Sequence, residues 1–94
     1  MSTTINSIQL IAIDLDGTLL NEYEKIGEFD NQALISAAKL KINFLLATGR
    51  SYYSTLTIIR SLPIHAYIAL HNGAIILNPF GKEIWRAIIR KKIL

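Results

Sequence analysis

A short apolar run that ends in two closely spaced carboxylates constrains this chain more than any other feature. Residues 8–13 are almost continuously apolar, and residues 14–17 that follow read Asp-Leu-Asp-Gly. A run of this length bounded by Asp and Gly is typical of a strand buried on both faces of a parallel sheet. We therefore expect Asp14 at the carboxyl end of such a strand, where an unpaired carboxylate is costly unless a cation or hydrogen bonds compensate it.

Helical patterns separate this run from two further apolar runs, at 42–47 and 66–70. We expect the first helix to be capped by Asp30, and the second to follow a cap at Ser51 and to stop at Pro63. Alternating strands and helices in this order imply right-handed crossovers. The sequence therefore predicts an α/β fold, a partial Rossmann-like core of three parallel strands with crossover helices.

The two ends of the first helix give different signals. Phe29 precedes the expected cap and Leu34 lies four positions after it, which is the spacing of a hydrophobic staple. At residues 39–41 the helix must end without the glycine that commonly follows a helix, so its C-terminal boundary is hard to place.

The last part of the chain predicts a hairpin. Residues 74–77 and 82–88 flank Asn-Pro-Phe-Gly at 78–81, where Pro suits the second position of a turn and Gly the fourth. We expect the chain to form one domain, with a βαβαβ unit at 8–70 and the hairpin at 72–88.

The composition favours a small protein with a buried sheet over a membrane protein. The chain has 94 residues, of which 51% are hydrophobic, but no apolar run approaches the roughly 18 residues that a membrane-spanning helix needs. Residues 1–9 contain no Lys or Arg, so no secretory signal is expected. The absence of cysteine excludes disulfides, thiol nucleophiles and thiolate metal sites. We therefore expect a cytosolic (cytoplasmic) protein that does not bind membranes.

The net charge of +3 is unevenly distributed. Six of the seven acidic residues lie at or before Asp30, whereas Arg86, Arg90, Lys91 and Lys92 are close to the end. The basic residues alternate with large apolar ones, unlike a phosphate-binding surface with basic residues spread along one face. Nucleic-acid binding is therefore not expected.

Polar residues follow each of the three expected strands, at 14–18, 48–50 and 71–73. In open α/β sheets ligands bind beyond the carboxyl ends of the strands, so these segments are expected to meet at one edge. Turns also favour Asp, Asn, Gly and Thr. For the second and third segments alone, turn formation is the better explanation.

The first segment carries a more specific signal. Asp14 and Asp16 would repel each other, so the pair suits a divalent cation, and oxygen ligands suit Mg²⁺. Gly17 would let the backbone approach a phosphate closely, and the nearby N–H groups with the Thr18 hydroxyl could donate to its oxygens.

Three other sites that use such residues fit less well. An EF-hand loop starting at Asp14 needs Gly at its sixth position and Glu at its twelfth, where this chain has Leu19 and Lys25. A phosphate-binding Gly-Lys-Ser/Thr loop is absent. A nucleotide-sugar transferase can use Asp-x-Asp on a divalent ion, but it does not explain the Gly-Thr-Leu-Leu that follows.

The stretch 11–20, Ile-Ala-Ile-Asp-Leu-Asp-Gly-Thr-Leu-Leu, resembles the first motif of the haloacid dehalogenase (HAD) superfamily, and Leu-Ala-Thr-Gly-Arg at 46–50 resembles its second. Residues 70–74 and the hairpin after them are similar to the Cof-type branch with a type IIB cap, which contains sugar-phosphate and small-metabolite phosphatases. The resemblance implies a magnesium-dependent hydrolase that acts on small phosphorylated metabolites through an aspartyl-phosphate.

By this resemblance, Asp14 would be the nucleophile and Asp16 would protonate the leaving oxygen and later activate water. The carboxylate of Asp14 and the main-chain carbonyl of Asp16 would bind Mg²⁺. The expected phosphate- or substrate-binding residues are Gly17, Thr18, Thr48, Gly49, Arg50 and Asn72. For Arg50 and Asn72, local capping and turn formation explain the residues about equally well.

The sequence also departs from the family. The third motif supplies a Lys and the fourth an acidic pair, but after Asp30 the only acid is Glu83, and Lys82, Lys91 and Lys92 lie where a cap is expected to begin. We therefore expect a truncated or split enzyme with little activity of its own.

The missing fourth motif has a structural consequence as well. In the family's sheet the first strand is central, so here residues 8–13 are expected at an edge, where an unpaired apolar strand invites association. The expected partners are a complementing C-terminal segment or a second copy of the chain. The alternative function is a non-catalytic remnant that binds another protein through this sheet edge.

Overall fold

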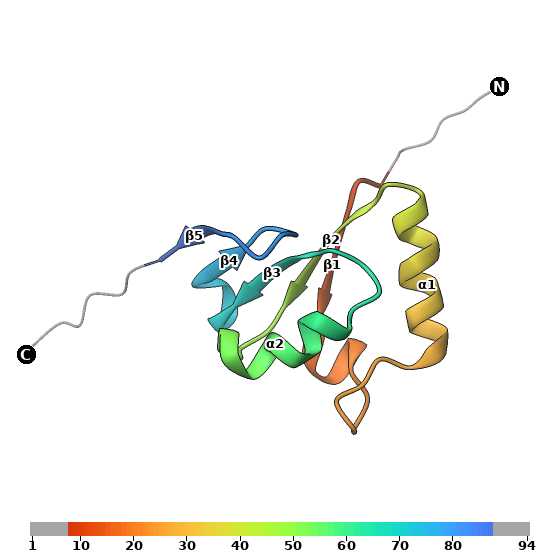
Figure 1. Cartoon of the computed structure of the whole chain (residues 1–94), viewed down its shortest axis with the longest axis horizontal. Coiled ribbons are helices and arrows are strands. Elements are labelled where there is room, and N and C mark those ends of the chain that lie inside the picture. The colour runs from red at the N-terminus through yellow and green to blue at the C-terminus, as the bar shows by residue number, and fades with distance from the viewer. Residues whose placement is uncertain (1–7, 88–94) are drawn as a thin grey trace, which may run out of the picture.

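A computed structural model describes residues 8–87 of the chain as an α/β fold (Figure 1). Strands and helices alternate up to β3, and a hairpin follows. The elements are β1 (Leu10–Asp14), a helical turn at Leu15–Leu19, α1 (Glu28–Lys39), β2 (Asn43–Ala47), α2 (Tyr52–Ser61), β3 (Tyr67–Leu70), a short turn at His71–Gly73, β4 (Ile75–Leu77) and β5 (Glu83–Arg86).

All five strands belong to one sheet, in the order β1-β2-β3-β4-β5. β1, β2 and β3 run parallel, whereas β3 with β4 and β4 with β5 are antiparallel. This arrangement confirms the predicted fold class, three parallel strands with crossover helices followed by a hairpin. The sequence did not predict that the hairpin extends the same sheet through β4.

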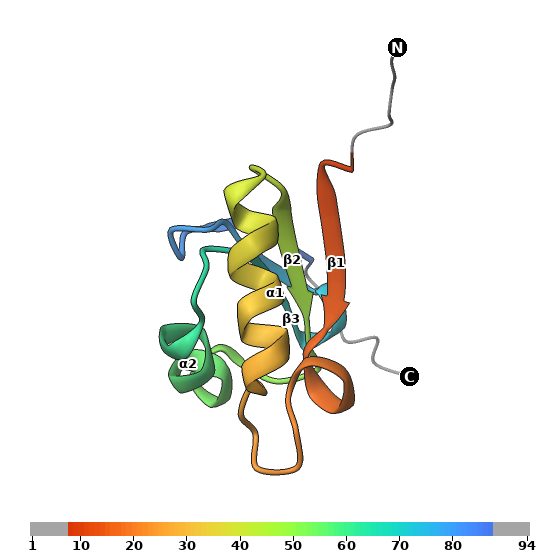
Figure 2. The same cartoon turned by 90° about the vertical axis from the view of Figure 1, so that its right-hand side faces the viewer.

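Both helices lie on one face of the sheet, as Figure 2 shows. Right-handed crossovers that move across the sheet in one direction, from β1 to β2 to β3, must place both helices on the same side. One apolar cluster joins that side of the sheet to both helices. It consists of Leu15, Leu19, Leu20, Leu34, Phe44, Leu46, Ile58, Ala66, Ile68, Leu70 and Leu77.

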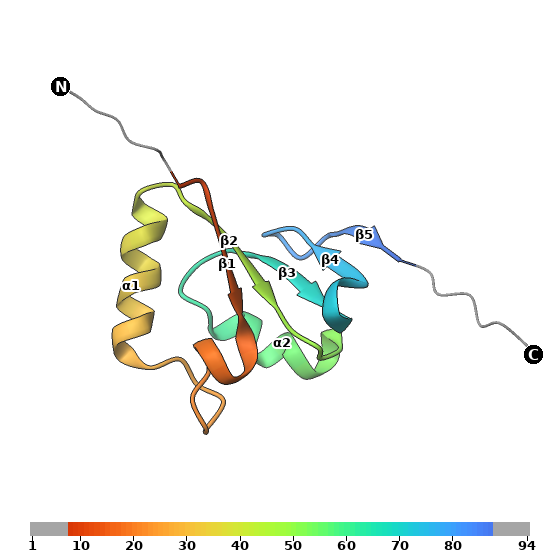
Figure 3. The same cartoon turned by 180° about the vertical axis from the view of Figure 1, so that it is seen from behind.

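The other face of the sheet has no helix over it in the described part of the chain (Figure 3). Burial in β1 therefore alternates, with Ile11 and Ile13 half-buried and Leu10 53% exposed. The prediction that this strand is buried on both faces is wrong, because only one face is covered. The prediction that it lies at an edge is confirmed, since β2 is its only neighbour among the strands of residues 8–87.

The start of α1 differs from the prediction. The helix begins after Gly27, whose carbonyl accepts the Asn31 N–H over 2.9 Å, and Asp30 lies in the first turn. Asp30 is therefore not the cap, although a carboxylate in the first turn still suits the helix dipole. Phe29 is 85% exposed, so no hydrophobic staple forms.

The other boundaries agree more closely with the sequence. Ser51 caps α2, with its side chain accepting from the Ser54 N–H over 3.4 Å, and the helix ends two residues before Pro63. Lys41, two residues after the end of α1, has φ +63°, a conformation usually adopted by glycine.

The turn between β4 and β5 also forms as expected. The Gly81 N–H donates to the Asn78 carbonyl over 2.9 Å, and Gly81 has φ +85°. The predicted end of the hairpin at Ile88 and the basic residues Arg90, Lys91 and Lys92 lie outside the described residues. Within 8–87, neither helix is long and apolar enough to cross a membrane.

Candidate active site

The carboxyl ends of β1 and β2 lie side by side. In the parallel register Asp14 pairs with Ala47, so Thr48 directly follows the residue opposite Asp14. β3 is in register with β2 through Ala47 and Ala69. The three polar segments predicted to meet at one edge therefore do so, and this edge is called the rim below.

A single helical turn, Leu15–Leu19, follows Asp14 and contains Asp16. The Leu20 N–H donates to the Leu15 carbonyl over 3.0 Å, which closes a turn wider than that of an α-helix. Within it Gly17 has φ +76°, and a Cβ there would meet no atom within 4 Å. The turn therefore requires glycine for its backbone conformation, and the sequence did not predict the turn itself.

Asp16 is held by residues from the next strand end. Its Oδ2 accepts the Thr48 hydroxyl over 2.7 Å, and its Oδ1 accepts Nε of Arg50 over 2.8 Å. The Thr48 Oγ1 also accepts the Arg50 backbone N–H over 3.1 Å, and Thr48 is only 3% exposed. Both oxygens of Asp16 are thus fixed in direction by a buried hydroxyl and a guanidinium.

Asp14 differs sharply from Asp16. It is exposed at the end of β1, and within residues 8–87 no lysine or arginine forms a salt bridge with it. No side-chain hydrogen bond of Asp14 occurs in that part of the chain either. One carboxylate of the pair is therefore restrained, while the other remains available to a ligand.

The third polar segment is tied to the second through the backbone. The Asn72 N–H donates to the Thr48 carbonyl over 3.0 Å, and the His71 N–H donates to the Arg50 carbonyl over 3.1 Å. A Cβ on Gly49 would lie 3.2 Å from Oδ1 of Asn72, so glycine leaves room for this amide. Asn72 therefore lies against the Thr48–Gly49 peptide.

Gly17 and Thr18 are exposed on the turn after Asp16. Thr18 lines a cavity of about 240 Å³ together with Ile13 and side chains of α1. No hydrogen bond among the described residues joins Thr18 to Thr48 or Arg50. A phosphate-binding role for Gly17 and Thr18 stays a prediction.

Comparison with known proteins identifies the family. A model of the haloacid dehalogenase-like hydrolases matches residues 11–93, which includes all the rim residues described above. The chain belongs to the haloacid dehalogenase-like hydrolases. The resemblance predicted from the two motifs is therefore confirmed.

Individual relatives of this hydrolase chain agree with that assignment. Phosphatase YwpJ of Bacillus subtilis is 36% identical over 85 residues, which cover 90% of this chain and 30% of YwpJ. The 5-amino-6-(5-phospho-D-ribitylamino)uracil phosphatase YcsE of Bacillus subtilis is 30% identical over 90 residues, which cover 93% of this chain and 33% of YcsE.

Solved structures give the same result. A haloacid dehalogenase-like hydrolase from B. subtilis superposes with a TM-score of 0.80 at 35% identity, covering 87% of this chain and 29% of that one. A haloacid dehalogenase-like hydrolase from Bacteroides thetaiotaomicron has a TM-score of 0.75 at 28% identity, covering 85% and 32%. The chain thus spans between 29% and 33% of the length of these four relatives.

One residue that contacts the rim was not found from the sequence. Nη1 of Arg50 donates to Oε1 of Glu24 over 2.9 Å, which joins the loop before α1 to the rim. This hydrogen bond is the largest of the causes that raise the pKa of Arg50, and the nearby charge of Asp16 acts in the same direction. Glu24 lies 26 positions before Arg50 in an otherwise polar loop, so no local pattern in the sequence signals the pair.

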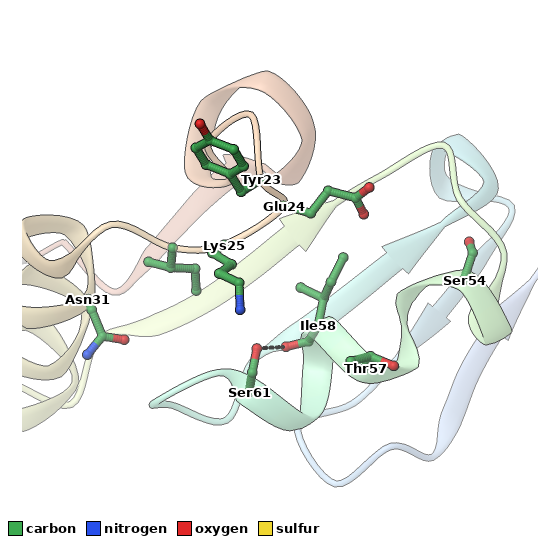
Figure 4. Close-up of a pocket in the computed structure, with 9 residues that line it drawn as sticks. Tyr23, Glu24, Lys25, Asn31, Ser54, Thr57, Ile58 and Ser61 are labelled. Atoms are coloured by element: carbon green, nitrogen blue, oxygen red, sulfur yellow. Dashed lines mark hydrogen bonds between the residues drawn. The ribbon is translucent and has the colours of Figure 1, made fainter.

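A cavity of about 580 Å³ lies between this loop and α2, beside the rim (Figure 4). Lys25 extends from the loop toward α2, where Ile58 and Ser61 line the opposite wall. None of the predicted site residues lines it, but Glu24 does. Glu24 therefore belongs both to this cavity and to the rim.

The rim offers a divalent cation few protein ligands. Among residues 8–87 no group of three or more His, Cys, Asp or Glu side chains is placed to hold a metal ion. The unengaged carboxylate of Asp14 and the main-chain carbonyl of Asp16 are hard oxygen donors, which suit Mg²⁺ when water and substrate fill the other positions. The residues present fit such an ion in part.

Proposed function

We propose that this chain carries the nucleophile half of a phosphatase site that hydrolyses small phosphorylated metabolites in the cytosol. The observation that carries the proposal is the contrast between the two carboxylates of the rim. Asp16 is held by Thr48 and Arg50, whereas Asp14 at the end of the adjacent strand has no cationic partner among the described residues. A free carboxylate beside a fixed one matches a nucleophile next to a general acid and base.

In this proposal an oxygen of the Asp14 carboxylate attacks phosphorus, and the bond from phosphorus to the ester oxygen breaks. A protonated Asp16 gives its proton to the leaving oxygen. The resulting Asp16 carboxylate then takes a proton from water, and the water oxygen attacks the aspartyl-phosphate. The bond from phosphorus to Asp14 breaks, inorganic phosphate leaves, and both side chains return to their starting forms.

The other rim residues bind and orient the phosphoryl group. The Arg50 N–H groups that face neither Asp16 nor Glu24 can donate to a phosphoryl oxygen. The Thr48 hydroxyl donates its one proton to Asp16, so it would bind a phosphoryl oxygen only after turning away from Asp16. The Asn72 amide lies beside them against Gly49. The Asp14 carboxylate and the Asp16 carbonyl would hold Mg²⁺, which would neutralise part of the charge of the phosphate.

The relatives support the substrate class. YwpJ is a phosphatase, and YcsE is a phosphatase of 5-amino-6-(5-phospho-D-ribitylamino)uracil, a small phosphorylated metabolite. We propose the same broad class for a protein that contains this chain. The rim residues are proposed to contact the phosphoryl group, which all members of this class share. We therefore propose no single metabolite as the substrate.

The nucleophile can be tested with beryllium fluoride, which forms a tetrahedral adduct on a carboxylate that resembles an aspartyl-phosphate. We expect ¹⁹F NMR of the full chain to show a bound species that requires Mg²⁺ and disappears in D14N. D30N, which removes a carboxylate from the first turn of α1, is the matched control and should leave the species unchanged. A bound species that persists in D14N would exclude Asp14 as the nucleophile.

Turnover is expected to need more than this chain. With only two protein oxygen donors for Mg²⁺, we expect the chain alone to release little phosphate from an aryl phosphate. Adding the part of YwpJ that lies beyond the matched region should raise the rate in the wild type and leave D14N inactive. Turnover by the chain alone at ordinary enzyme rates, roughly 1 s⁻¹ or more, would contradict the expected dependence on a second segment.

A second function is favoured by the edge strand. In the part of the chain that the structure describes, β1 pairs only with β2. On the face without helices, a hollow of about 390 Å³ is lined by Leu10, Leu45, Tyr67 and Ile76. A sheet with an open edge and an apolar face can bind another chain by adding a strand. Binding of the YwpJ segment without any gain in turnover would support this function over the catalytic one.

A further inference from the structure

The loop before α1 is a tight hairpin with defined hydrogen bonds. The Asn21 N–H donates to the Lys25 carbonyl over 2.8 Å, and the Glu24 N–H donates to the Asn21 carbonyl over 2.9 Å. Leu20 and Ile26 form an isolated β-bridge at its base. The Asn21 side chain accepts the backbone N–H of Lys25 over 3.1 Å. Local bonds thus hold the backbone of this loop at Asn21, Glu24 and Lys25.

Glu24 occupies the left-handed position of this hairpin, with φ +58°. A turn followed by one left-handed residue is a common short hairpin connection, and glycine or asparagine usually takes that position. A residue with a Cβ and a long side chain is strained there. Local backbone preferences therefore disfavour Glu24 at this position, and a compensating interaction must come from elsewhere.

The compensating interaction is with Arg50. Oε1 of Glu24 accepts Nη1 of Arg50 over 2.9 Å, while Oδ1 of Asp16 accepts Nε over 2.8 Å. Two carboxylates from different segments thus hold the guanidinium from two sides. The Arg50 side chain is 26% exposed, compared with 62% for Glu24, so the pair is partly shielded from water.

This arrangement fixes where the remaining donors of Arg50 lie. A guanidinium is planar and carries five N–H donors in a rigid fork, so two anchored nitrogens determine the direction of the others. Without Glu24, Asp16 alone would hold Arg50 at Nε, and the fork could rotate about that contact. Thr48 and Asp16 would keep their own hydrogen bond.

We propose that Glu24 is a positioning residue, which accepts a strained backbone conformation in order to hold the Arg50 guanidinium beside Asp16 for a phosphoryl oxygen. This inference rests on the proposed phosphatase function and deepens it. It assigns to the loop before α1 a role in phosphate binding that neither sequence motif contains. The role acts through Arg50, since Glu24 itself does not touch the substrate.

The proposal makes stability and function change in opposite directions. In E24G glycine relieves the strained conformation, so the loop should fold at least as well as in the wild type. Arg50 nevertheless loses one of its two anchors. E24Q keeps a side-chain oxygen that can accept from Nη1 but removes the charge, so its effect on Arg50 should be intermediate.

The test is ¹H–¹⁵N NMR of the Arg50 Nη–H groups in the full chain, combined with binding of inorganic phosphate in Mg²⁺. We expect a shifted, exchange-protected Nη–H signal in the wild type that moves toward the free-arginine position in E24G, because Glu24 accepts from Nη1. Phosphate affinity should fall by about three- to tenfold, the range for one partly exposed charge-assisted hydrogen bond. K41G, which relieves the left-handed Lys41 far from the rim, should leave both readouts unchanged.

The outcomes separate this inference from the proposed function. Arg50 Nη–H signals that are the same in E24G and the wild type would overturn the positioning role, whether or not the affinity for phosphate changes. A signal that moves in E24G, in a chain whose wild type binds no phosphate, would support the anchoring of Arg50 and count against the proposed function. A loss of folding in E24G would contradict the strain assigned to Glu24.

Discussion

The Thr48 hydroxyl donates to Oδ2 of Asp16 over 2.7 Å, across 32 positions of sequence. The two residues follow neighbouring parallel strands, so the register of β1 with β2 brings them together. Because the bond joins two residues of the chain itself, the orientation of Asp16 does not depend on a contact with substrate. Preorganised polar groups of this kind lose little energy to reorganisation during a reaction.

Removing the Thr48 hydroxyl should therefore destabilise the fold as well as the site. In T48V the shape is kept, but Asp16 loses a donor and the Arg50 backbone N–H loses an acceptor. We expect the free energy of unfolding to fall by about 1–3 kcal/mol, measured by urea denaturation. T48S keeps the hydroxyl and should lose less than half as much. Equal losses in both variants would assign the effect to packing.

The parts of the site that the sequence predicted are those set by strand order. Parallel strands end at one edge, so Asp14, Thr48 and Asn72 could be placed together before their distances were known. Ser51 was correctly assigned as a cap, because a cap bonds to a backbone N–H only three residues away. Local patterns of this kind are visible in a linear sequence.

The parts that were missed depend on contacts or competition between neighbours. Asp30 and Gly27 are both acceptable caps, and no local pattern in the sequence favours one over the other. In the structure Gly27 is the cap, so the helix begins three residues before the predicted start. The bond of Glu24 to Arg50 joins residues 26 positions apart and needs a left-handed backbone that Glu rarely adopts. The burial of β1 was overestimated because, within residues 8–87, no helix covers one face of the sheet.

Lys41 offers a test of backbone strain away from the site. It follows α1 with φ +63°, the position at which glycine is preferred after a helix. We expect K41G to raise the free energy of unfolding by about 0.5–1 kcal/mol, measured by thermal denaturation. K41A keeps a Cβ and should give no such gain, so equal gains in the two variants would exclude relief of strain as the cause.

The bare face of the sheet and the β1 edge should make the chain associate. Leu10 is 53% exposed on that face, at the edge strand. A charged side chain on an edge strand opposes pairing with another chain. L10K should therefore lower the weight-average molecular mass measured by sedimentation equilibrium at a given protein concentration. F29K replaces an 85% exposed side chain on α1, away from this face, and should have no effect. A wild type that sediments as a monomer throughout would contradict the expectation.

The hairpin contains an ion pair with a defined pH response. Glu83 accepts two hydrogen bonds from Arg86, over 2.9 and 2.6 Å, and these bonds hold the pKa of Glu83 below its ordinary value. The pair is therefore intact above the ordinary pKa of a glutamate and is lost as pH falls through the lowered value. In a titration followed by ¹³C NMR of the carboxyl groups, R86Q should raise the pH at which the Glu83 carboxyl is half-protonated. A midpoint that does not move would show that the pair does not form in solution.

Asp14 should cost stability when no metal is present. It lies two residues from Asp16 without a cationic partner among residues 8–87, so the two carboxylates repel each other. In metal-free buffer at low salt we expect D14N to raise the free energy of unfolding by about 0.5 kcal/mol, the size typical of exposed charge interactions. The gain should shrink as salt is added, because exposed charges are screened.

Magnesium should reverse the stability order of the wild type and D14N. An ion that binds only the folded chain stabilises it by an amount that grows with the logarithm of the ion concentration relative to Kd. Millimolar Mg²⁺ should therefore raise the melting temperature of the wild type and not that of D14N. D30N removes a carboxylate from the first turn of α1, where the helix dipole favours negative charge. It should lower stability slightly and keep the response to Mg²⁺. If D14N and the wild type respond equally to Mg²⁺, the ion binds elsewhere and the free carboxylate of the rim is not its ligand.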